Sequence, residues 1–452
     1  MCRVRDMPGM EVLMSKHTSE DMKHIYTLDG RVPIAKAVPF GLQHILAMFV
    51  ANIAPILIVS GACHLSAPQI TNLVQCAMII AGIGTLIQLF PLWKIGSGLP
   101  IVMGISFTFV GIFCVIGPQY GYGSILGAVL IGGVIEGILG LFARYWRKII
   151  SPIVAASVVT SIGFSLLSVG AASFGGGSGS KDFGSWQNLL LGFLTLLCCL
   201  LFQIFAKSYL KQLSVLFGLI IGYLGAACMG VVDFSALSQC GIIAFPHFLP
   251  VTPEFYPGAV LTVALIFLVS ATETIGDTSA LTSSALNRDV TDEEITGSLA
   301  CDGFISSVSA LFGCLPITSF SQNVGLIAMT KVINRFAIAT GAVIMILAGF
   351  FPVIGAFLGT LPDAVLGGCT IMMFGNIVVS GLQMISSCGF TQRNITIAAL
   401  SLSVGIGFTQ VPDIFHIFPG IIQNVFADNC VATVFLVAIL ANIILPKEEN
   451  NK

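Results

Sequence analysis

The sequence predicts an all-α polytopic membrane protein with about fourteen transmembrane segments. These form two inverted repeats of seven, with short broken helix or strand segments in spans 3 and 10. Three observations predict this fold: an apolar composition, about fourteen apolar runs, and a short sequence that recurs seven runs later. The 452 residues are 56% hydrophobic and 9% charged, with a mean hydropathy of +0.98. A soluble core needs far less apolar surface than this.

The charged and cysteine residues argue against a nucleic-acid partner and against a metal site. The formal net charge is -2, and the 19 basic residues are too scattered to form a nucleic-acid footprint. The 13 cysteines show no CxxC pair or His/Cys ligand spacing, and we expect them to be small buried side chains. We also find no HExxH motif and no Gly-rich phosphate loop in the right context, so we expect no enzyme, no metal and no cofactor.

The chain begins with a charged segment and continues with apolar runs. Residues 1–37 lack the apolar core of a signal peptide, and we expect them to form an uncleaved cytoplasmic tail. With about 20 residues per helix as the yardstick, the expected spans are 40–60, 68–90, 101–117, 124–143, 150–172, 187–206, 212–232, 257–276, 296–313, 318–333, 336–358, 362–384, 394–409 and 430–446. The segment 411–428, rich in Phe, Pro and Ile, is also open to interpretation as an interfacial helix.

The basic residues test this topology independently. If the tail is cytoplasmic and fourteen spans follow, only Lys181 of the later basic residues falls outside the cell. The cytoplasmic set is Lys94, Arg144, Arg147, Lys148, Lys207, Lys211, Arg288, Lys331, Arg335, Arg393, Lys447 and Lys452. We therefore expect a multi-pass protein of the plasma (inner) membrane with both termini in the cytoplasm.

One short sequence occurs twice, seven spans apart. Leu99-Pro100-Ile101 in the third span recurs as Leu315-Pro316-Ile317 before the tenth, and a Ser-Phe pair follows each copy. An odd number of spans per repeat inverts the second copy, as in many secondary transporters. Three letters can recur by chance, but both copies coincide with short, broken spans. Non-helical backbone at membrane depth lines a cavity or is buried in protein, so we expect a ligand there.

Four carboxylates lie within apolar runs, where each costs on the order of 3 kcal/mol at a helix centre. They are Glu136, Glu273, Asp277 and Asp302. Glu273 and Asp277 are four residues apart, so on a helix they share one face and could line one polar cavity. Two coupled like charges suit a proton-binding relay. The alternative is an ordinary solvated pair at a helix end.

The other polar residues in apolar runs allow two interpretations each. Glu136 stands among glycines, and we favour a buried acid that is hydrogen-bonded to a neighbouring helix over a proton-transfer group. Asp302 could cap amides as easily as bind substrate. Gln43 and His44 interrupt the first apolar run. A single histidine there is more often a core residue than a ligand, but Gln43 keeps a functional role open.

Together these residues resemble a known family. The ten residues from Gln322 to Lys331, QNVGLIAMTK, are similar to the signature of the nucleobase-ascorbate transporters. In that signature Gln, Glu or Pro precedes Asn-x-Gly, and Thr follows after four intervening residues, with Arg, Lys or Gly after it. The family's other functional positions match Gln43-His44, Ser106-Phe107, the run from Glu273 to Asp277, and Asp302. The resemblance covers about 39–445.

The resemblance implies a core domain that carries the substrate and a gate domain. Spans 1–4 and 8–11 would form the core, and spans 5–7 and 12–14 the gate, in a homodimer with an elevator-like movement. The implied boundaries are a cytoplasmic tail at 1–37, core at 38–147, gate at 148–232, an extracellular connection at 233–255, core at 256–358, gate at 359–446 and a cytoplasmic tail at 447–452.

The first position of the signature separates branches of the family. Gln322 resembles the purine branch, which carries xanthine and uric acid, whereas Glu is typical of uracil carriers and Pro of animal ascorbate carriers. By this analogy Glu273 and Gln322 would bond to the purine ring and Phe107 would stack on it. Backbone amides near Phe107 and Ser321 would add donors, and Asn323 belongs to the same implied site. Ser106 lies at a position that varies between xanthine and urate carriers.

The resulting hypothesis is proton-coupled uptake of xanthine, uric acid or both across a lipid membrane. Protonation of Glu273, Asp277 or Asp302 would remove a charge that is costly to move, with His44 and Gln43 in support. Sodium coupling stays open, because the same carboxylates could bind a hard cation. A uracil or other nucleobase symporter, a channel and, less favoured, an anion exchanger of the same fold are the alternatives.

Overall fold

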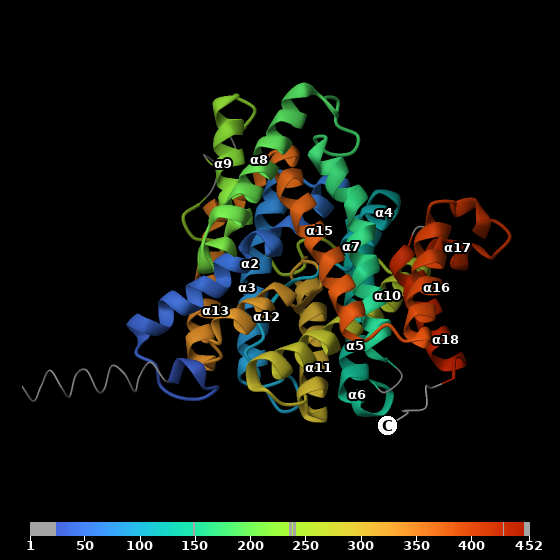
Figure 1. The fold of residues 1–452 in the computed structure, drawn as a ribbon. Helices are drawn as coiled ribbons and strands as arrows, with labels where there is room; N and C mark the ends of the chain where they lie inside the picture. Colours follow the sequence, from blue (N-terminus) through green and yellow to red (C-terminus); the bar gives the residue numbers. More distant parts are fainter. Residues whose placement is uncertain (1–23, 148–149, 235–236, 238–240, 428, 447–452) are drawn as a thin grey trace, which may run out of the picture.

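The computed structural model describes residues 24–147, 150–234, 237, 241–427 and 429–446. Residues 1–23 and 447–452 of the expected tails lie outside these ranges. Helices dominate the described chain (Figure 1). In chain order the elements are η1 (His24–Tyr26), α2 (Ile34–Ala62), α3 (Ala67–Leu89), β1 (Met103–Ile105), α4 (Val110–Tyr120), α5 (Tyr122–Leu141), α6 (Ala143–Trp146), α7 (Pro152–Phe174), α8 (Trp186–Phe205), η3 (Ser208–Lys211), α9 (Ser214–Cys228), α10 (Pro257–Leu281), η5 (Thr282–Leu286), α11 (Asp292–Leu311), β2 (Ile317–Ser319), α12 (Ser321–Thr330), α13 (Arg335–Gly349), α14 (Pro352–Gly359), α15 (Asp363–Ser387), α16 (Gln392–Thr409), η6 (Pro412–Phe415), α17 (Gly420–Phe426) and α18 (Cys430–Ile444).

Each predicted span coincides with a helix, a bent helix pair, or a strand followed by a helix. By length and composition, seven described helices could cross a membrane, and the pair α13 and α14, bent by 79°, raises this number to eight. The other segments are shorter, as in α4, α9 and α18, or begin with charge, as in α11 with its three acidic residues. The structure therefore supports a multi-pass membrane protein, whereas the number fourteen stays a prediction.

Local sequence explains where several helices begin. Pro152 and Pro257 open α7 and α10, where a missing N–H costs nothing. Thr291 caps α11 with a capping box: its hydroxyl accepts from Glu294 N, and Glu294 Oε2 accepts from Thr291 N at 2.9 Å. These signals fix the start of two helices, α10 and α11, that carry the acids Glu273 and Asp302.

The two repeated sequences meet in a two-stranded sheet. β1 and β2 pair antiparallel with Met103 opposite Ser319 and Ile105 opposite Ile317. The middle residue of β1, Gly104, leaves room for an aromatic ring, because a methyl group there would lie 2.4 Å from Phe320 Cε2. Each strand is followed by a short helix, α4 or α12. The expectation of short broken helix or strand segments in spans 3 and 10 is confirmed.

Helix packing is most extensive within two groups of elements. In one group α5 packs on α10 and α11, and α13 packs on α2 and α3. In the other, α7 packs on α15, α8 on α9, and α16 on α18. Figure 1 shows α7 and α15 side by side near the centre, with α16 and α18 beyond them. The assignment of these groups to a moving core and a gate remains a prediction.

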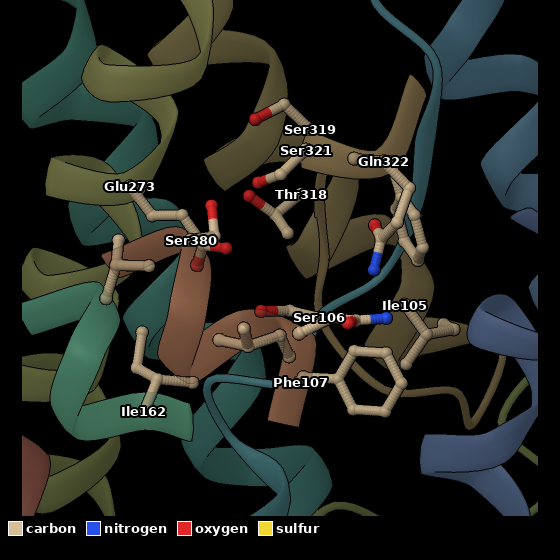
Figure 2. A pocket seen from close by; sticks show the side chains of 14 residues that line it. Ile105, Ser106, Phe107, Ile162, Glu273, Thr318, Ser319, Ser321, Gln322 and Ser380 are labelled. Atoms are coloured by element: carbon tan, nitrogen blue, oxygen red, sulfur yellow. The ribbon is translucent and has the colours of Figure 1, made fainter. Parts of the chain in front are cut away.

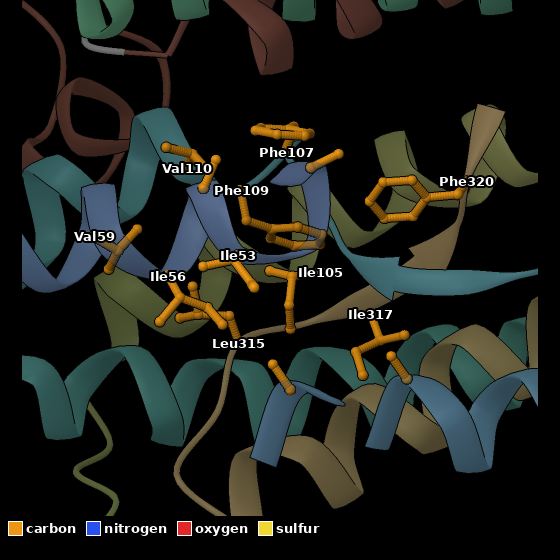
Figure 3. Close-up of a cluster of buried hydrophobic side chains, with 14 of the residues drawn as sticks. Ile53, Ile56, Val59, Ile105, Phe107, Phe109, Val110, Leu315, Ile317 and Phe320 are labelled. Carbon is orange, nitrogen blue, oxygen red and sulfur yellow. The ribbon is translucent and has the colours of Figure 1, made fainter. Parts of the chain in front are cut away.

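The sheet lies inside the largest apolar core. Ile105, Ile317 and Phe320, which lie in or beside the strands, pack with Phe109 and with Ile53 of α2 (Figure 3). All five side chains are buried. Apolar packing therefore holds two non-helical segments from distant parts of the chain at one place, and the polar cavity forms beside them.

Candidate substrate-binding site

A cavity of about 190 Å³ lies where the ends of β1 and β2 meet α7, α10, α12 and α15. Its size suits one small ligand. It is lined by Ile105, Ser106, Phe107, Val159, Ile162, Glu273, Thr318, Ser319, Phe320, Ser321, Gln322, Asn376, Ile377 and Ser380. Five of the predicted substrate-binding residues are therefore brought together: Ser106, Phe107, Glu273, Ser321 and Gln322.

Side chains from α2 and α3 hold β1 and the turn after it. Asn52 Oδ1 accepts from Ile105 N at 2.8 Å, and Thr85 Oγ1 accepts from Met103 N at 3.0 Å. Ser106 N donates to Pro316 O at 2.9 Å, which joins the end of β1 to the residue before β2. These bonds satisfy backbone groups that would otherwise be unpaired in an apolar core. Ser106 and Phe107 are thereby fixed at the cavity wall.

Glu273 projects from α10 into the cavity. Its Oε2 accepts a hydrogen bond of 2.7 Å from the hydroxyl of Thr108, which follows Phe107. Figure 2 shows the Glu273 carboxyl and the Gln322 amide pointing into the space from opposite sides, with Ser106 and Phe107 between them. The Phe107 ring is buried and meets Phe374 of α15 edge to face at 5.5 Å. An acceptor, an amide and an aromatic ring thus surround one small volume.

Asp277 lies one turn after Glu273 on α10 and anchors the start of α12. Its carboxylate accepts from the hydroxyl of Ser321 at 2.8 Å and from that of Ser319 at 3.0 Å. Asp277 is not among the lining residues, whereas both of these serines are. The pair Glu273 and Asp277 therefore does share one helix face. It contacts the segment after β1 through Thr108, and the end of β2 and the start of α12 through Ser319 and Ser321.

Asp302 of α11 holds β2 from the other side. Its Oδ2 accepts from Thr274 Oγ1 at 2.5 Å, from Thr318 Oγ1 at 3.0 Å and from Ser319 N at 3.4 Å. Gln88 of α3 donates to its Oδ1 at 3.3 Å. Asp302 is fully buried and does not line the cavity. Two roles were considered for Asp302, capping of amides and binding of substrate. The structure shows the first kind of contact, with the amide of Ser319.

The signature segment forms nearly all of α12, from its second residue, Gln322, to its C-cap, Lys331. Ser321 and Gln322 are the first two residues of α12, and the first N–H groups of a helix have no acceptor within that helix. The expected amide donors near Ser321 are therefore present at the cavity edge. Asn323 is different: it is buried and donates to His44 O at 3.2 Å, so it lies behind the lining residues.

His44 and Gln43 lie on α2, outside the set of residues that line the cavity. His44 is 1% exposed and its Nδ1 is 3.4 Å from Asn323 Nδ2. A packed position that supports the signature asparagine agrees with the interpretation of His44 as a core residue. Neither His44 nor Gln43 lines the cavity.

The sequence reasoning missed the wall formed by α7 and α15. Val159 and Ile162 of α7 and Asn376, Ile377 and Ser380 of α15 all line the cavity. Asn376 and Ser380 are four residues apart on α15, which places two polar groups on one face. This spacing is visible in the sequence, but it does not show that the face lines a cavity.

The surroundings of the cavity are acidic and lack a compensating base among its lining residues. Glu273 is the charged member of the lining set. The ion pairs between described residues join Arg147 to Asp292, Arg288 to Glu294 and Arg335 to Asp29, away from the cavity acids. No group of three or more metal-ligating side chains occurs within the described ranges. The site therefore favours a neutral or N–H-rich ligand over an anion.

Glu136 differs from what the sequence led us to expect. Its side chain is 2% exposed, yet neither carboxyl oxygen has a hydrogen-bond partner among the residues that the structure describes. The expected bond to a neighbouring helix is therefore wrong. The physical reason is that α5 meets α11 through Gly133, Gly137 and Gly140. Ser307 of α11 has a hydroxyl at this contact, but it donates to Leu130 O.

Comparison with known proteins agrees with this site. A model described as the Permease family, Xan_ur_permease, matches residues 35–414. Xanthine permease XanQ of Escherichia coli strain K12 is 36% identical over 453 residues, which cover 96% of each chain. Uric acid permease PucK of Bacillus subtilis strain 168 is 37% identical over 384 residues, covering 84% of this chain and 89% of PucK.

A solved structure shares the fold. The murine anion transporter Slc26a9 matches with a TM-score of 0.63 at 12% identity, covering 98% of this chain and 72% of that chain. At this identity the likeness concerns the fold alone. The family match and the two permeases, each more than a third identical over most of its length, show more. This chain belongs to the Xan_ur_permease family, the nucleobase-ascorbate transporters that its signature at Gln322 predicted.

Proposed function

We propose that this protein takes up an oxidised purine nucleobase, xanthine, uric acid or both, by proton symport. The observation that carries the proposal is the cavity into which Glu273 and Gln322 point from opposite sides, beside the Phe107 ring. An oxidised purine has adjacent N–H and C=O groups on a flat ring. An acceptor, an amide that both donates and accepts, and an aromatic face match those groups.

The same groups predict which purines are rejected. Adenine carries an exocyclic amine where xanthine carries a carbonyl, so it would leave buried polar groups of the site unpaired. Sites built to bond particular substrate atoms discriminate strongly against analogues that lack them. Xanthine should therefore bind much more tightly than adenine, and an excess of adenine should compete weakly for uptake.

The proposal of proton coupling rests on the acids around the cavity. Glu273, Asp277 and Asp302 take part in none of the ion pairs between described residues, and a charged carboxylate is costly to carry across a membrane. Protonation removes that charge. The membrane potential contributes about 2.3 kcal/mol per charge per 100 mV, which is enough to drive accumulation.

The proposed movement is an elevator motion of a core against a gate. The strands, α10 and α12 would belong to the core, and α7 and α15 to the gate, so the cavity would lie between the moving parts. The elevator motion is supported by the residues of the cavity, which come from both groups of packed helices. We further propose a homodimer in the plasma (inner) membrane with both termini in the cytoplasm.

The decisive experiment is uptake of radiolabelled xanthine and urate by cells that lack their own purine carriers. We expect saturable uptake, mutual competition between the two purines, and loss of accumulation with a protonophore. Uptake that needs sodium and ignores the protonophore, with the potential clamped, would contradict proton coupling but not purine transport. Absence of uptake for both purines at verified expression in the membrane would contradict the substrate assignment.

Two alternative ligands are tested by the same cells. Uracil is disfavoured because Gln322 stands where uracil carriers typically have Glu. A small inorganic anion is disfavoured because the lining carries a carboxylate and no basic side chain. Labelled uracil and bicarbonate or sulfate should therefore show no uptake above that of cells without the protein, and purine uptake should be indifferent to their presence.

A further inference from the structure

Glu136 is a buried acid that the proposed site does not use. It lies on α5, a helix that contributes no residue to the cavity. Its side chain is 2% exposed, and both carboxyl oxygens lack a hydrogen-bond partner within the described part of the chain. A charged carboxylate in such a place costs several kcal/mol unless it is paired. A carboxyl group at this buried position therefore calls for a functional explanation.

The position of Glu136 relates it to the other acids. α5 packs on α10, which carries Glu273 and Asp277, and on α11, which carries Asp302. The contact between α5 and α11 is made through glycine, because a methyl group at Gly303 would lie 2.1 Å from Gly137 N. Glu136 precedes Gly137 in the chain and Asp302 precedes Gly303. The two acids thus flank the closest approach of their helices.

The helices packed on α5 bring few other titratable groups to this region. From α10 they are Glu273 and Asp277, and from α11 Cys301 and Asp302. The acids Asp292, Glu293 and Glu294 lie in the first turn of α11, and Glu254 lies against Gly123 in the first turn of α5. The third neighbour, α4, carries Cys114 and Tyr120 as its titratable side chains. None of the ion pairs of the described residues involves Glu136. Since like charges in a low-dielectric region disfavour one another, charge on one of these carboxyls promotes proton binding at the others.

We propose, building on the proton symport proposed above, that Glu136 is a second proton-binding site of the core. It accepts a proton when Asp302 or Glu273 is charged and releases it when they are neutral, so up to two protons are bound among the three carboxyls. The proton passes between carboxylate oxygens, and no other bond is made or broken. Glu136 thereby sets how many protons accompany each purine, while Glu273 and Gln322 set which purine binds.

The test measures proton movement and purine movement separately. Purified protein in liposomes with a pH-sensitive dye inside is given an inward xanthine gradient, and protons taken up per xanthine are counted at several pH values. Counterflow of labelled xanthine, with equal xanthine on both sides, reports movement of the loaded carrier alone. For Glu136→Gln we expect counterflow within about twofold of the wild type, with accumulation driven by a pH gradient reduced at least tenfold.

Two further variants keep the result decisive. Glu136→Met replaces the carboxyl by an apolar chain of similar length and should behave like Glu136→Gln. Glu293→Gln removes an exposed acid from the first turn of α11 and should match the wild type in every assay. If both Glu136 variants keep the wild-type proton ratio and pH profile, or if both lose counterflow as well, the proton role of Glu136 is wrong.

The outcome for the wild type separates this inference from the proposed function. If the wild-type protein moves xanthine without any proton, the proposed symport fails and the role of Glu136 fails with it. If the wild type couples protons to xanthine and the Glu136 variants do so equally, the symport stands and only the inference about Glu136 falls. A reduced proton ratio in both variants, with counterflow retained, supports it.

Discussion

The Thr108 hydroxyl donates a hydrogen bond of 2.7 Å to Glu273 Oε2, so the residue after the aromatic ring of the cavity is tied to the acid opposite it. Thr108 follows β1, and Glu273 lies on α10. The bond uses one carboxylate oxygen of Glu273, which lines the cavity. The acceptor that we propose for a purine N–H is therefore held in place by a protein hydroxyl.

Glu273→Gln should weaken xanthine binding strongly. The amide keeps the volume of the side chain but loses the charged acceptor, and a hydrogen bond to a charged group contributes about 1.5–3 kcal/mol. We expect KM for xanthine to rise roughly 10- to 100-fold, as measured by initial uptake rates with expression matched by immunoblot. Uptake with unchanged affinity and pH dependence would show that the central assignment of this site is wrong.

Thr108→Val should have a smaller effect on the same parameter. It keeps the shape of the side chain and removes the donor that orients Glu273, and a hydrogen bond of this kind contributes about 1 kcal/mol. We expect KM to rise by roughly fivefold. Thr108→Ser keeps the hydroxyl and is the matched control. Equal KM values for the Val and Ser variants would mean that the bond does not orient the carboxylate.

Phe107→Ala should remove the stacking surface. Stacking of a base on an aromatic side chain contributes about 1–3 kcal/mol, so we expect at least a roughly fivefold rise in KM for both xanthine and urate. Phe107→Tyr keeps the ring and should stay close to the wild type. The comparison of the two variants by competition assays distinguishes lost stacking from general damage, which would affect the Tyr variant as well.

Asn376→Leu should weaken binding from the side of α15. Asn376 and Ser380 are the polar lining groups of that helix, so they can offer hydrogen-bond partners to the ligand edge that faces α15. Uric acid has an additional carbonyl on its five-membered ring, so we expect the variant to lose more affinity for urate than for xanthine. Ile377→Leu, at a lining position of the same helix, is the control. An equal loss for both purines would argue against recognition of that edge.

Asn334→Ala should destabilise the protein without touching the cavity. The Asn334 amide donates to His24 O, Thr27 O and Gly30 O at 2.9, 3.3 and 3.1 Å, and its Oδ1 caps α13 by accepting from Ala337 N. Loss of a cap and of buried bonds costs about 1–3 kcal/mol. We expect a lower melting temperature in detergent, with xanthine KM unchanged. Asn334→Asp keeps the cap acceptor but places a buried carboxylate against three backbone carbonyl oxygens, so it should be destabilised at least as much as Asn334→Ala.

The sequence predicted the features that depend on local pattern. Apolar runs located the helices. The repeated Leu-Pro-Ile marked both strands, because a short segment that interrupts an apolar run and does not continue the helix can be recognised from that segment alone. The spacing of Glu273 and Asp277 placed both on one face of α10, as the structure shows. The signature likewise placed Gln322 at the cavity.

Features that depend on contacts between distant segments were not predictable. The register of Met103 opposite Ser319 follows from packing around the sheet, which no local pattern encodes. Asn376 looked like any polar residue of a membrane helix, because its importance comes from the cavity that other helices form. Glu136 was expected to have a bonding partner. The sequence shows the glycines around it but not that the Ser307 hydroxyl of α11 is bonded to Leu130 O.

The pairing of β1 with β2 has a consequence for how the protein folds during its synthesis on the ribosome. The second strand is synthesised long after the first, so β1 is unpaired until β2 has been made. Meanwhile Asn52 and Thr85, from helices already made, accept from the amides of Ile105 and Met103. In the nascent first half these two side chains thus satisfy backbone amides of β1. The sheet itself can form only after both halves of the chain have been synthesised.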